Sequence, residues 1–204
     1  MNRAYVSKGS RIPCHRAFAV AVFATLVITL NGWQEAAPMV ENLLSLVGWG
    51  LVAIGVTGRT WCGSYISGHK TTTLVVEGPY SICRNPLYFF SFVGGLGVML
   101  MTETMLLPIL FMVLFWSYYP QVIAREEGTL ARLHGATFEA YCSRVPRFWP
   151  SFSSYSEPAS YMIAAEKFRK HLGQAGWFVM AGGVIEFIEG MHISGYLPTL
   201  LRIY

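Results

Sequence analysis

The sequence has few charged residues. Of its 204 residues only 13% are Asp, Glu, Lys or Arg, whereas 53% are hydrophobic and 15% are aromatic. A soluble globular domain contains about 25% charged residues, so this composition suits a lipid bilayer better than water. The net charge of +4 does not indicate nucleic acid, because basic residues in a membrane protein more often report its orientation. We therefore expect the lipid bilayer as a partner and no nucleic acid.

Several other signals are absent. The four cysteines have unrelated spacings, there is no CxxC, and the five histidines have no metal-like spacing, so we expect free thiols and no metal site. Gly94-Gly95-x-Gly97 lacks the third glycine of a dinucleotide-binding loop and follows no strand. It favours helix packing, with close approach of a cofactor as the alternative. Without repeats, low-complexity tracts or long linkers, residues 1–204 are predicted to form one domain.

Long apolar runs dominate what remains. A helix needs roughly 17 to 25 apolar residues to cross the hydrocarbon core, and the sequence offers about five candidate spans, which predict an all-α polytopic transmembrane bundle. They cover residues 17–32, 39–58, 87–101, 105–123 and a shorter 175–185. The third and fourth are so close that they must form an antiparallel hairpin. The fifth contains two glycines and precedes Glu186 and Glu189, so spanning, lying at the interface and packing inside the bundle all stay open.

The basic residues are distributed unevenly. They precede the first span, lie between the second and third, and follow the fourth, whereas loops 33–38 and 102–104 contain none. Lys and Arg concentrate on the cytoplasmic side. This pattern predicts a cytoplasmic N-terminus and two cytoplasmic connections, in the inner membrane if the source is bacterial.

Both connections have recognisable local signals. Gly78-Pro79 is typical of a turn, and Pro86 suits the first turn of the third span, where its missing N–H costs nothing. The fourth helix is predicted to continue over residues 123–134, because charged and apolar residues alternate there at helical spacing. Gly135 is its expected C-cap.

Two polar clusters adjoin the apolar hairpin. One precedes and opens the third span, the other closes the fourth, and the hairpin brings both to the cytoplasmic face. Their residues are Tyr80, Arg84, Asn85 and Tyr88, and Arg125, Glu126 and Glu127. Carboxylates, guanidinium groups and rings together complement a zwitterionic amino acid joined to an aromatic base, as in S-adenosylmethionine. The simpler alternatives are a solvated helix face for the Glu pair and a snorkelling Arg at a helix start.

In their order and spacing these segments resemble the isoprenylcysteine carboxyl methyltransferase family over about residues 59–150. The matching pieces are residues 74–80, Arg84-Asn85-Pro86-Leu87-Tyr88, Glu126-Glu127, Gly135, Tyr141 and Val145-Pro146-Arg147. Gly95 and Gly97 with the Glu pair are also similar to the cofactor motifs of phospholipid N-methyltransferases. Two positions depart from the first family, in which His usually stands at Asn85 and the eukaryotic members have a substrate-contacting Arg at Val122. These departures weaken the case for a prenylcysteine carboxylate as substrate.

The resemblance implies a cytoplasmic pocket for S-adenosylmethionine, lined by eleven residues. They are Thr72, Thr73, Leu74, Val75, Tyr80, Arg84, Asn85, Pro86, Leu87, Tyr88 and Glu126. Glu126 would hold the cofactor ammonium, Arg84 or Arg147 would anchor a carboxylate, and Glu127 is a candidate proton acceptor. We therefore expect an S-adenosylmethionine-dependent methyltransferase acting on a hydrophobic carboxylate, thiol or amine. The alternatives are a non-catalytic scaffold that keeps the fold and a nicotinamide-dependent enzyme similar to sterol reductases.

Overall fold

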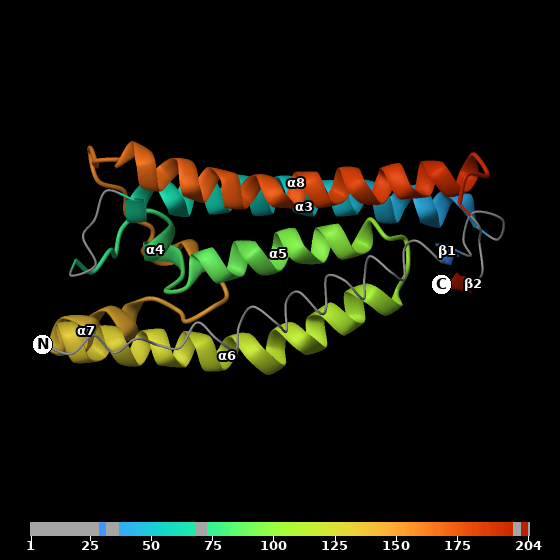
Figure 1. Ribbon diagram of the computed structural model, residues 1–204. Helices are drawn as coiled ribbons and strands as arrows, with labels where there is room; N and C mark the ends of the chain where they lie inside the picture. The colour runs from blue at the N-terminus through green and yellow to red at the C-terminus, as the bar shows by residue number, and fades with distance from the viewer. Residues whose placement is uncertain (1–28, 32–36, 68–72, 198–200, 204) are drawn as a thin grey trace, which may run out of the picture.

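The structure, a computed structural model, describes residues 29–31, 37–67, 73–197 and 201–203 and is mainly helical (Figure 1). The described α-helices are α3 (Pro38–Ser67), α4 (Pro79–Ile82), α5 (Pro86–Leu100), α6 (Leu106–His134), α7 (Ala136–Arg144) and α8 (Ala165–Ile193). A short 3₁₀ helix, η2 (Phe152–Ser154), and a parallel pair of strands, β1 (Thr29–Asn31) and β2 (Leu201–Ile203), accompany them. The predicted all-α fold is confirmed.

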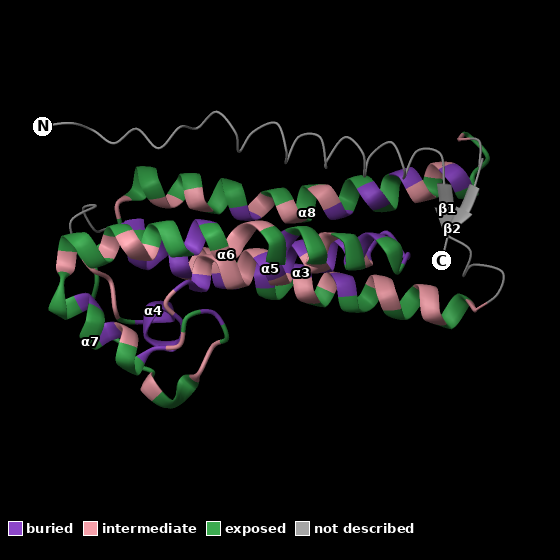
Figure 2. Cartoon of the chain, turned by 90° about the horizontal axis from the view of Figure 1, so that it is seen from below, coloured by how far each residue is buried: buried purple, intermediate pink, exposed green. Residues whose placement is uncertain are grey.

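Two of these helices are long and apolar enough to cross a membrane. They are α3 and α6, and the shorter apolar α5 lies between them in the chain. Only 22% and 28% of their apolar windows are buried inside the protein, so most residues of these windows are partly or fully exposed, unlike those of a core helix in a soluble protein (Figure 2). Leu43 and Leu46 on α3 and Ile109 and Val113 on α6 are examples of exposed residues. These outward apolar faces are surfaces for lipid.

The predicted boundaries need three corrections. Most of the span predicted at 17–32 lies outside the described residues, and its residues Thr29–Asn31 form β1 because they pair with Leu201–Ile203. The second span does not end at Gly58, since α3 continues to Ser67 and includes Arg59. The fifth segment is a 29-residue helix, α8, much longer than 175–185. The predicted continuation of α6 to His134 and its cap at Gly135 are confirmed.

Glycines allow α3 and α5 to pack backbone against backbone. A Cβ atom on Gly55 would stand 2.5 Å from the Gly94 Cα, and one on Gly97 would stand 2.6 Å from the Gly48 carbonyl oxygen. A Cβ on Gly95 would meet the Phe111 ring at 2.6 Å. The packing interpretation of the glycine cluster is therefore confirmed, because these glycines face helices and rings of the bundle.

Helix α8 runs antiparallel to α3 along most of its length (Figure 1). His171 packs on Gly63 near one end of the pair, and Glu186 accepts hydrogen bonds from Ser45 Oγ (3.1 Å) and Trp49 Nε1 (3.0 Å) near the other. At about 1.5 Å per residue, 29 residues extend about 44 Å, which exceeds a hydrocarbon core of about 30 Å. Because α8 contacts α3 near both of its ends, it packs lengthwise along the bundle.

The connection between α5 and α6 is short and buried, as the predicted hairpin requires. Thr102, Glu103 and Thr104 are all buried there, and Glu103 has a left-handed backbone with φ of 55°. Carboxylate oxygens of Glu103, Glu41 on α3 and Glu189 on α8 lie within 4.8 Å of one another. This acidic cluster is at the opposite end of the bundle from α4 and α7.

Candidate functional site

The site is built around the chain between α3 and α5. Gly78 adopts a φ of 59°, and a Cβ there would stand 2.3 Å from the Tyr65 ring, so only glycine fits this turn. Pro79 then starts α4, and Pro86 starts α5 as predicted. The turn and the two prolines place residues 80–88 against the ends of α3 and α6.

A later segment, residues 146–156, lies across α4 and is called the strap below. Its backbone bonds to the chain on both sides of α4. The N–H of Arg84 donates to the Pro146 carbonyl (2.9 Å), that of Ser151 to the Ile82 carbonyl (2.9 Å), and that of Gly78 to the Ser156 carbonyl (2.8 Å). The strap thus satisfies backbone groups around α4 that no helix pairs.

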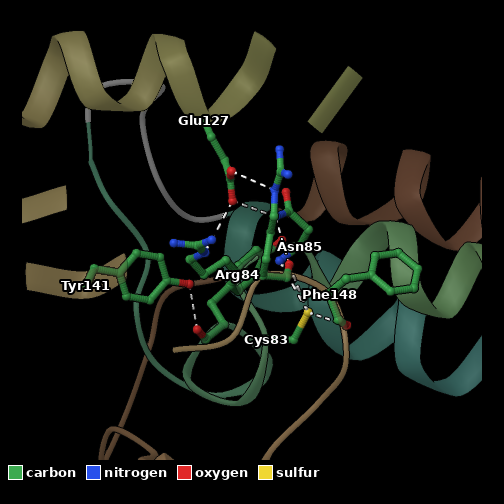
Figure 3. A network of polar contacts seen from close by, with 8 residues as sticks. Cys83, Arg84, Asn85, Glu127, Tyr141 and Phe148 are labelled. Carbon is green, nitrogen blue, oxygen red and sulfur yellow. Dashed lines mark hydrogen bonds and ion pairs between the residues drawn. The ribbon is translucent and has the colours of Figure 1, made fainter. Parts of the chain in front are cut away.

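Glu127 of α6 is the centre of a polar network (Figure 3). Its Oε1 accepts a hydrogen bond from Asn85 Nδ2 (3.0 Å) and forms an ion pair with Arg84 Nε (3.2 Å). Its Oε2 forms an ion pair with Arg147 Nε (3.0 Å), and Asn85 Nδ2 also donates to the Arg147 carbonyl (3.0 Å). The side chains of Arg84 and Glu127 are 14% and 15% exposed, whereas that of Arg147 is 46% exposed. The network therefore ties α6, the start of α5 and the strap together.

The neighbouring Glu126 has a different environment. It is exposed, and its Oε1 accepts a hydrogen bond from the Tyr88 hydroxyl at 2.7 Å. The Tyr88 ring packs edge-on against Tyr119 of α6, with centroids 5.4 Å apart. Glu126 is thus oriented from one side and open on the other, whereas Glu127 is held by one hydrogen bond and two ion pairs.

Tyr80 contributes a buried hydroxyl for which the described part of the chain provides no hydrogen-bond partner. Its backbone carbonyl accepts a hydrogen bond from the Tyr141 hydroxyl at 2.6 Å, which docks α7 on α4. Burial, followed by the influence of Cys62 and Tyr141, raises the pKa of Tyr80. The hydroxyl therefore stays neutral and is able to donate a hydrogen bond.

The neighbouring Cys83 is also buried. Its thiol donates to the Phe148 carbonyl of the strap at 3.0 Å (Figure 3). Burial raises the pKa of Cys83 to about 12. This thiol is therefore a structural group that holds the strap, since only a thiolate is a good nucleophile.

A cavity of about 420 Å³ lies next to this network. It is lined by the end of α3, the extended chain before Gly78 and the chain after the strap; the residues are Tyr65, Leu74, Val75, Val76, Glu77, Pro158, Ser160, Tyr161 and Met162. Its volume falls in the range of about 300–1,000 Å³ that is usual for small-molecule sites. Tyr80 belongs to the same hydrophobic cluster as Tyr65 and Val75, two lining residues, so its ring packs against residues of the cavity wall.

The structure brings most of the predicted site residues to one end of the bundle. One polar network contains Arg84, Asn85, Glu127 and Arg147, and a direct hydrogen bond joins Tyr88 to Glu126. The cavity is lined in part by Leu74 and Val75. The first turn of α5 contains Pro86 and Leu87. Thr73 is exposed and is not among the cavity-lining residues. Thr72 lies outside the described residues. The assignment of these residues to a cofactor stays a prediction.

Sequence reasoning missed two tyrosines of the cavity. The rings of Tyr65 and Tyr161 stack with centroids 4.2 Å apart, and the Tyr65 hydroxyl donates to Glu157 Oε1 at 3.0 Å. Tyr161 would suit a headgroup belt, but here it packs on the end of α3. The two tyrosines are 96 residues apart in the sequence, so no local sequence pattern would pair them.

The fold defines a class of protein, a helical membrane bundle with a polar network and a cavity at one end. Comparison with known proteins identifies that class. The phospholipid methyltransferase family model matches residues 38–137, from α3 to the start of α7, and so contains Tyr80, Asn85 and both glutamates. The chain belongs to this family of membrane methyltransferases.

Two relatives with curated descriptions match almost the whole chain, and a third matches part of it. The nickel-cobalt-cadmium resistance protein NccN of Alcaligenes xylosoxydans xylosoxydans is 34% identical over 94% of this chain and 88% of its own length. The cobalt-zinc-cadmium resistance protein CzcN of Cupriavidus metallidurans is 33% identical over 95% and 88%. The protein-S-isoprenylcysteine O-methyltransferase of Schizosaccharomyces pombe is 31% identical over 38% of this chain and 33% of its own length. No solved structure matches the chain.

Proposed function

We propose that this protein transfers a methyl group from S-adenosylmethionine to a hydrophobic acceptor that partitions into the membrane. The observation that carries the proposal is the Tyr80 hydroxyl. The hydroxyl is buried without a partner in the described structure, and it is close enough to Glu126 for the two groups to interact electrostatically. The Tyr80 ring packs in one cluster with the cavity residues Tyr65 and Val75. An unsatisfied buried hydroxyl is costly, and a bound ligand would remove that cost.

The residues present suit the cofactor. The open carboxylate of Glu126, oriented by Tyr88, would bind an ammonium group, and the Tyr80 hydroxyl would donate to a carboxylate or ribose oxygen. Val75 and the stacked Tyr65 and Tyr161 offer apolar and aromatic surface for an adenine ring. The bound cofactor would supply a sulfonium methyl group, which passes to the acceptor nucleophile while the sulfur keeps the bonding electron pair.

The protein's own contribution is to position the reactants and to exclude water. Glu127 serves this purpose as an anchor, since Asn85, Arg84 and Arg147 already contact its carboxylate through one hydrogen bond and two ion pairs. That arrangement favours Glu127 as a holder of α5 and the strap over Glu127 as a proton acceptor. A carboxylate or thiolate acceptor fits best, because it would need no base.

Isothermal titration of the detergent-purified chain with S-adenosylhomocysteine tests the proposal. Glu126→Gln removes a charge-assisted hydrogen bond of about 1.5–3 kcal/mol, and should weaken binding about 10- to 100-fold. Glu139→Gln, at an exposed position on α7, is the matched control and should leave affinity unchanged. No heat of binding, or equal affinity for both variants, would contradict the proposal. A scaffold binds no such nucleotide, and a reductase-like enzyme instead binds a nicotinamide cofactor.

We propose that the site faces the cytoplasm, in the inner membrane of a bacterial cell. The support is the concentration of Arg and Lys at the site end, on the extension of α6, on α7 and on the first turns of α8. A membrane-impermeant maleimide should label Cys142, which is half-buried on α7, in inverted vesicles. Labelling of Cys142 from the outside of spheroplasts would show that the site faces the opposite side of the membrane.

The names of the two long-matching relatives suggest a physiological setting. We propose that methyl transfer by this chain contributes to resistance to cobalt, nickel or cadmium. Growth of a deletion strain on these metals, complemented by wild type or by Glu126→Gln, tests this. Complementation by wild type alone supports a catalytic contribution. Equal complementation by both would show that resistance does not need the cofactor site.

A further inference from the structure

Arg59 is a cation inside the helix bundle. It lies on α3, where the sequence analysis expected a connection, and it is only partly exposed. Its Nη1 donates to the Ser91 hydroxyl of α5, and its Cζ atom stands 5.7 Å from the centroid of the Phe178 ring on α8. The guanidinium group therefore occupies the space where α3, α5 and α8 meet.

No carboxylate neutralises this cation within the described structure. The ion pairs recorded there do not include Arg59, and its buried Nε has no hydrogen-bond acceptor. Ser91 does not require Arg59 either, because its hydroxyl donates to the Leu87 carbonyl. A charged group at this depth is expensive unless it is paired, so the fold provides no sufficient structural reason for Arg59.

The surroundings of Arg59 suit an anion. The groups close enough to interact electrostatically with its charge are Cys62, Tyr119, Tyr80 and Tyr88, and His171 of α8. Each of these is a neutral group, and among the three tyrosines Tyr80 carries the hydroxyl described above. A guanidinium group binds carboxylates and phosphates with two parallel hydrogen bonds, and neighbouring hydroxyl groups are able to donate to the same anion.

The position of Arg59 separates it from the cofactor groups. Ser91 follows Tyr88 by three residues on α5, so Arg59 contacts the helix about 4.5 Å further along it, beyond the Tyr88–Glu126 pair. Phe178, against which Arg59 stacks, is flanked by Trp177 and Val179, which are 71% and 45% exposed on the outer face of α8. Arg59 therefore lies between the cofactor groups and a lipid-facing surface.

We propose that Arg59 binds the anionic group, a carboxylate or phosphate, of a hydrophobic methyl acceptor whose chain enters from the bilayer beside Phe178. This rests on the proposed methyl transfer and specifies its substrate class. It also supplies the positive charge that Val122, buried on α6, does not provide.

The test compares amphiphiles that share one chain and differ in the head group. Binding of dodecyl phosphate, laurate and dodecanol to the full-length protein in nanodiscs is measured with S-adenosylhomocysteine present. Wild type should bind an anionic probe at least about tenfold more tightly than dodecanol, and Arg59→Gln should remove that preference. A preference for dodecyl phosphate points to a lipid phosphate, and one for laurate points to an acid. Equal binding of all three probes overturns the proposal.

Two variants serve as controls. Arg169→Gln removes an exposed charge from α8 and should change nothing, whereas Ser91→Ala removes the group that Arg59 contacts. If Ser91→Ala abolishes anion preference as fully as Arg59→Gln, Arg59 has only a structural role. If Arg59→Gln fails to fold, Arg59→Lys serves instead, because it keeps the positive charge but lacks the two parallel donors of a guanidinium group. Arg59→Lys should bind laurate several-fold more weakly than wild type, and an unchanged affinity refutes the proposal. If wild type does not bind S-adenosylhomocysteine, the proposed methyl transfer is contradicted. The anion preference is then judged from the binding of the three amphiphiles alone.

Discussion

Replacing Glu127 by Gln should destabilise the site end of the bundle. The substitution keeps the shape and one acceptor oxygen for Asn85, but it removes the charge that pairs with Arg84 and Arg147. Breaking a fully buried pair costs about 3–5 kcal/mol. Because the Arg84 and Glu127 side chains are 14% and 15% exposed, we expect a smaller cost of about 2–3 kcal/mol.

Thermal unfolding in detergent, followed by circular dichroism, measures this cost. For a chain of this size about 1 kcal/mol shifts Tm by about 2–4 °C, so Glu127→Gln should lower Tm by about 5–10 °C. Arg147→Gln is the matched control from the same network. Its side chain is 46% exposed, and a solvent-exposed pair contributes about 0–1 kcal/mol, so its Tm should fall by at most about 4 °C.

The comparison of the two variants decides the argument. Equal decreases in Tm would show that the exposure of a side chain does not determine how much its ion pair stabilises the fold. An unchanged Tm for Glu127→Gln would show that the network does not stabilise the fold. In a double-mutant cycle, Arg84→Gln combined with Glu127→Gln should cost less than the sum of the single changes, with a coupling of about 0.5–3 kcal/mol.

Three further predictions concern other parts of the bundle. Gly55→Ala places a Cβ 2.5 Å from the backbone of α5 and should lower the free energy of unfolding by about 1–3 kcal/mol. The control variant Gly50→Ala meets nothing within 4 Å and should be neutral. Equal Tm values for the two variants would refute the close packing of α3 on α5. In a Cys14→Ser background at pH 8, maleimide should modify Cys142 and spare Cys83, whose buried thiol has a pKa raised to about 12; mass spectrometry of the labelled peptides checks this. Burial and then the neighbouring carboxylate of Glu189 raise the pKa of Glu103 from 4.5 to about 9. The folded state therefore stays protonated at pH values where the unfolded chain has lost this proton, and Tm should fall as pH rises from about 4.5 to about 9. Glu103→Gln should flatten this dependence of Tm on pH, and an unchanged slope would contradict the assignment.

Much of this architecture was accessible from the sequence because membrane helices and their caps depend on local patterns. Apolar runs located α5 and the membrane part of α6, Pro86 marked the first turn of α5, and Gly135 marked the end of α6. The proximity of residues 84–88 to Glu126 and Glu127 followed from the hairpin, since two helices joined by a tight turn bring their far ends together.

The parts that sequence reasoning missed depend on tertiary contacts. Arg59 looked like the end of a span because charge normally marks a boundary, but α3 continues through it to Ser67 as neighbouring helices surround the side chain. Helix α8 was underestimated because Glu186 interrupts its apolar pattern, and only the contacts with Ser45 and Trp49 show where that carboxylate is accommodated. The stacking of Tyr65 on Tyr161 joins residues too distant for any local signal.

The strap has a consequence for the order of biosynthesis. Each helix can enter the membrane as it emerges, but the backbone groups of Gly78, Ile82 and Arg84 obtain their partners only from residues 146–156. The Cys83 thiol likewise waits for the Phe148 carbonyl, 65 residues later in the chain. A nascent chain that ends before the strap therefore has its membrane helices but an unfinished site. The polar network and the backbone hydrogen bonds around α4 are therefore completed late, when the strap has been synthesised and packs over α4.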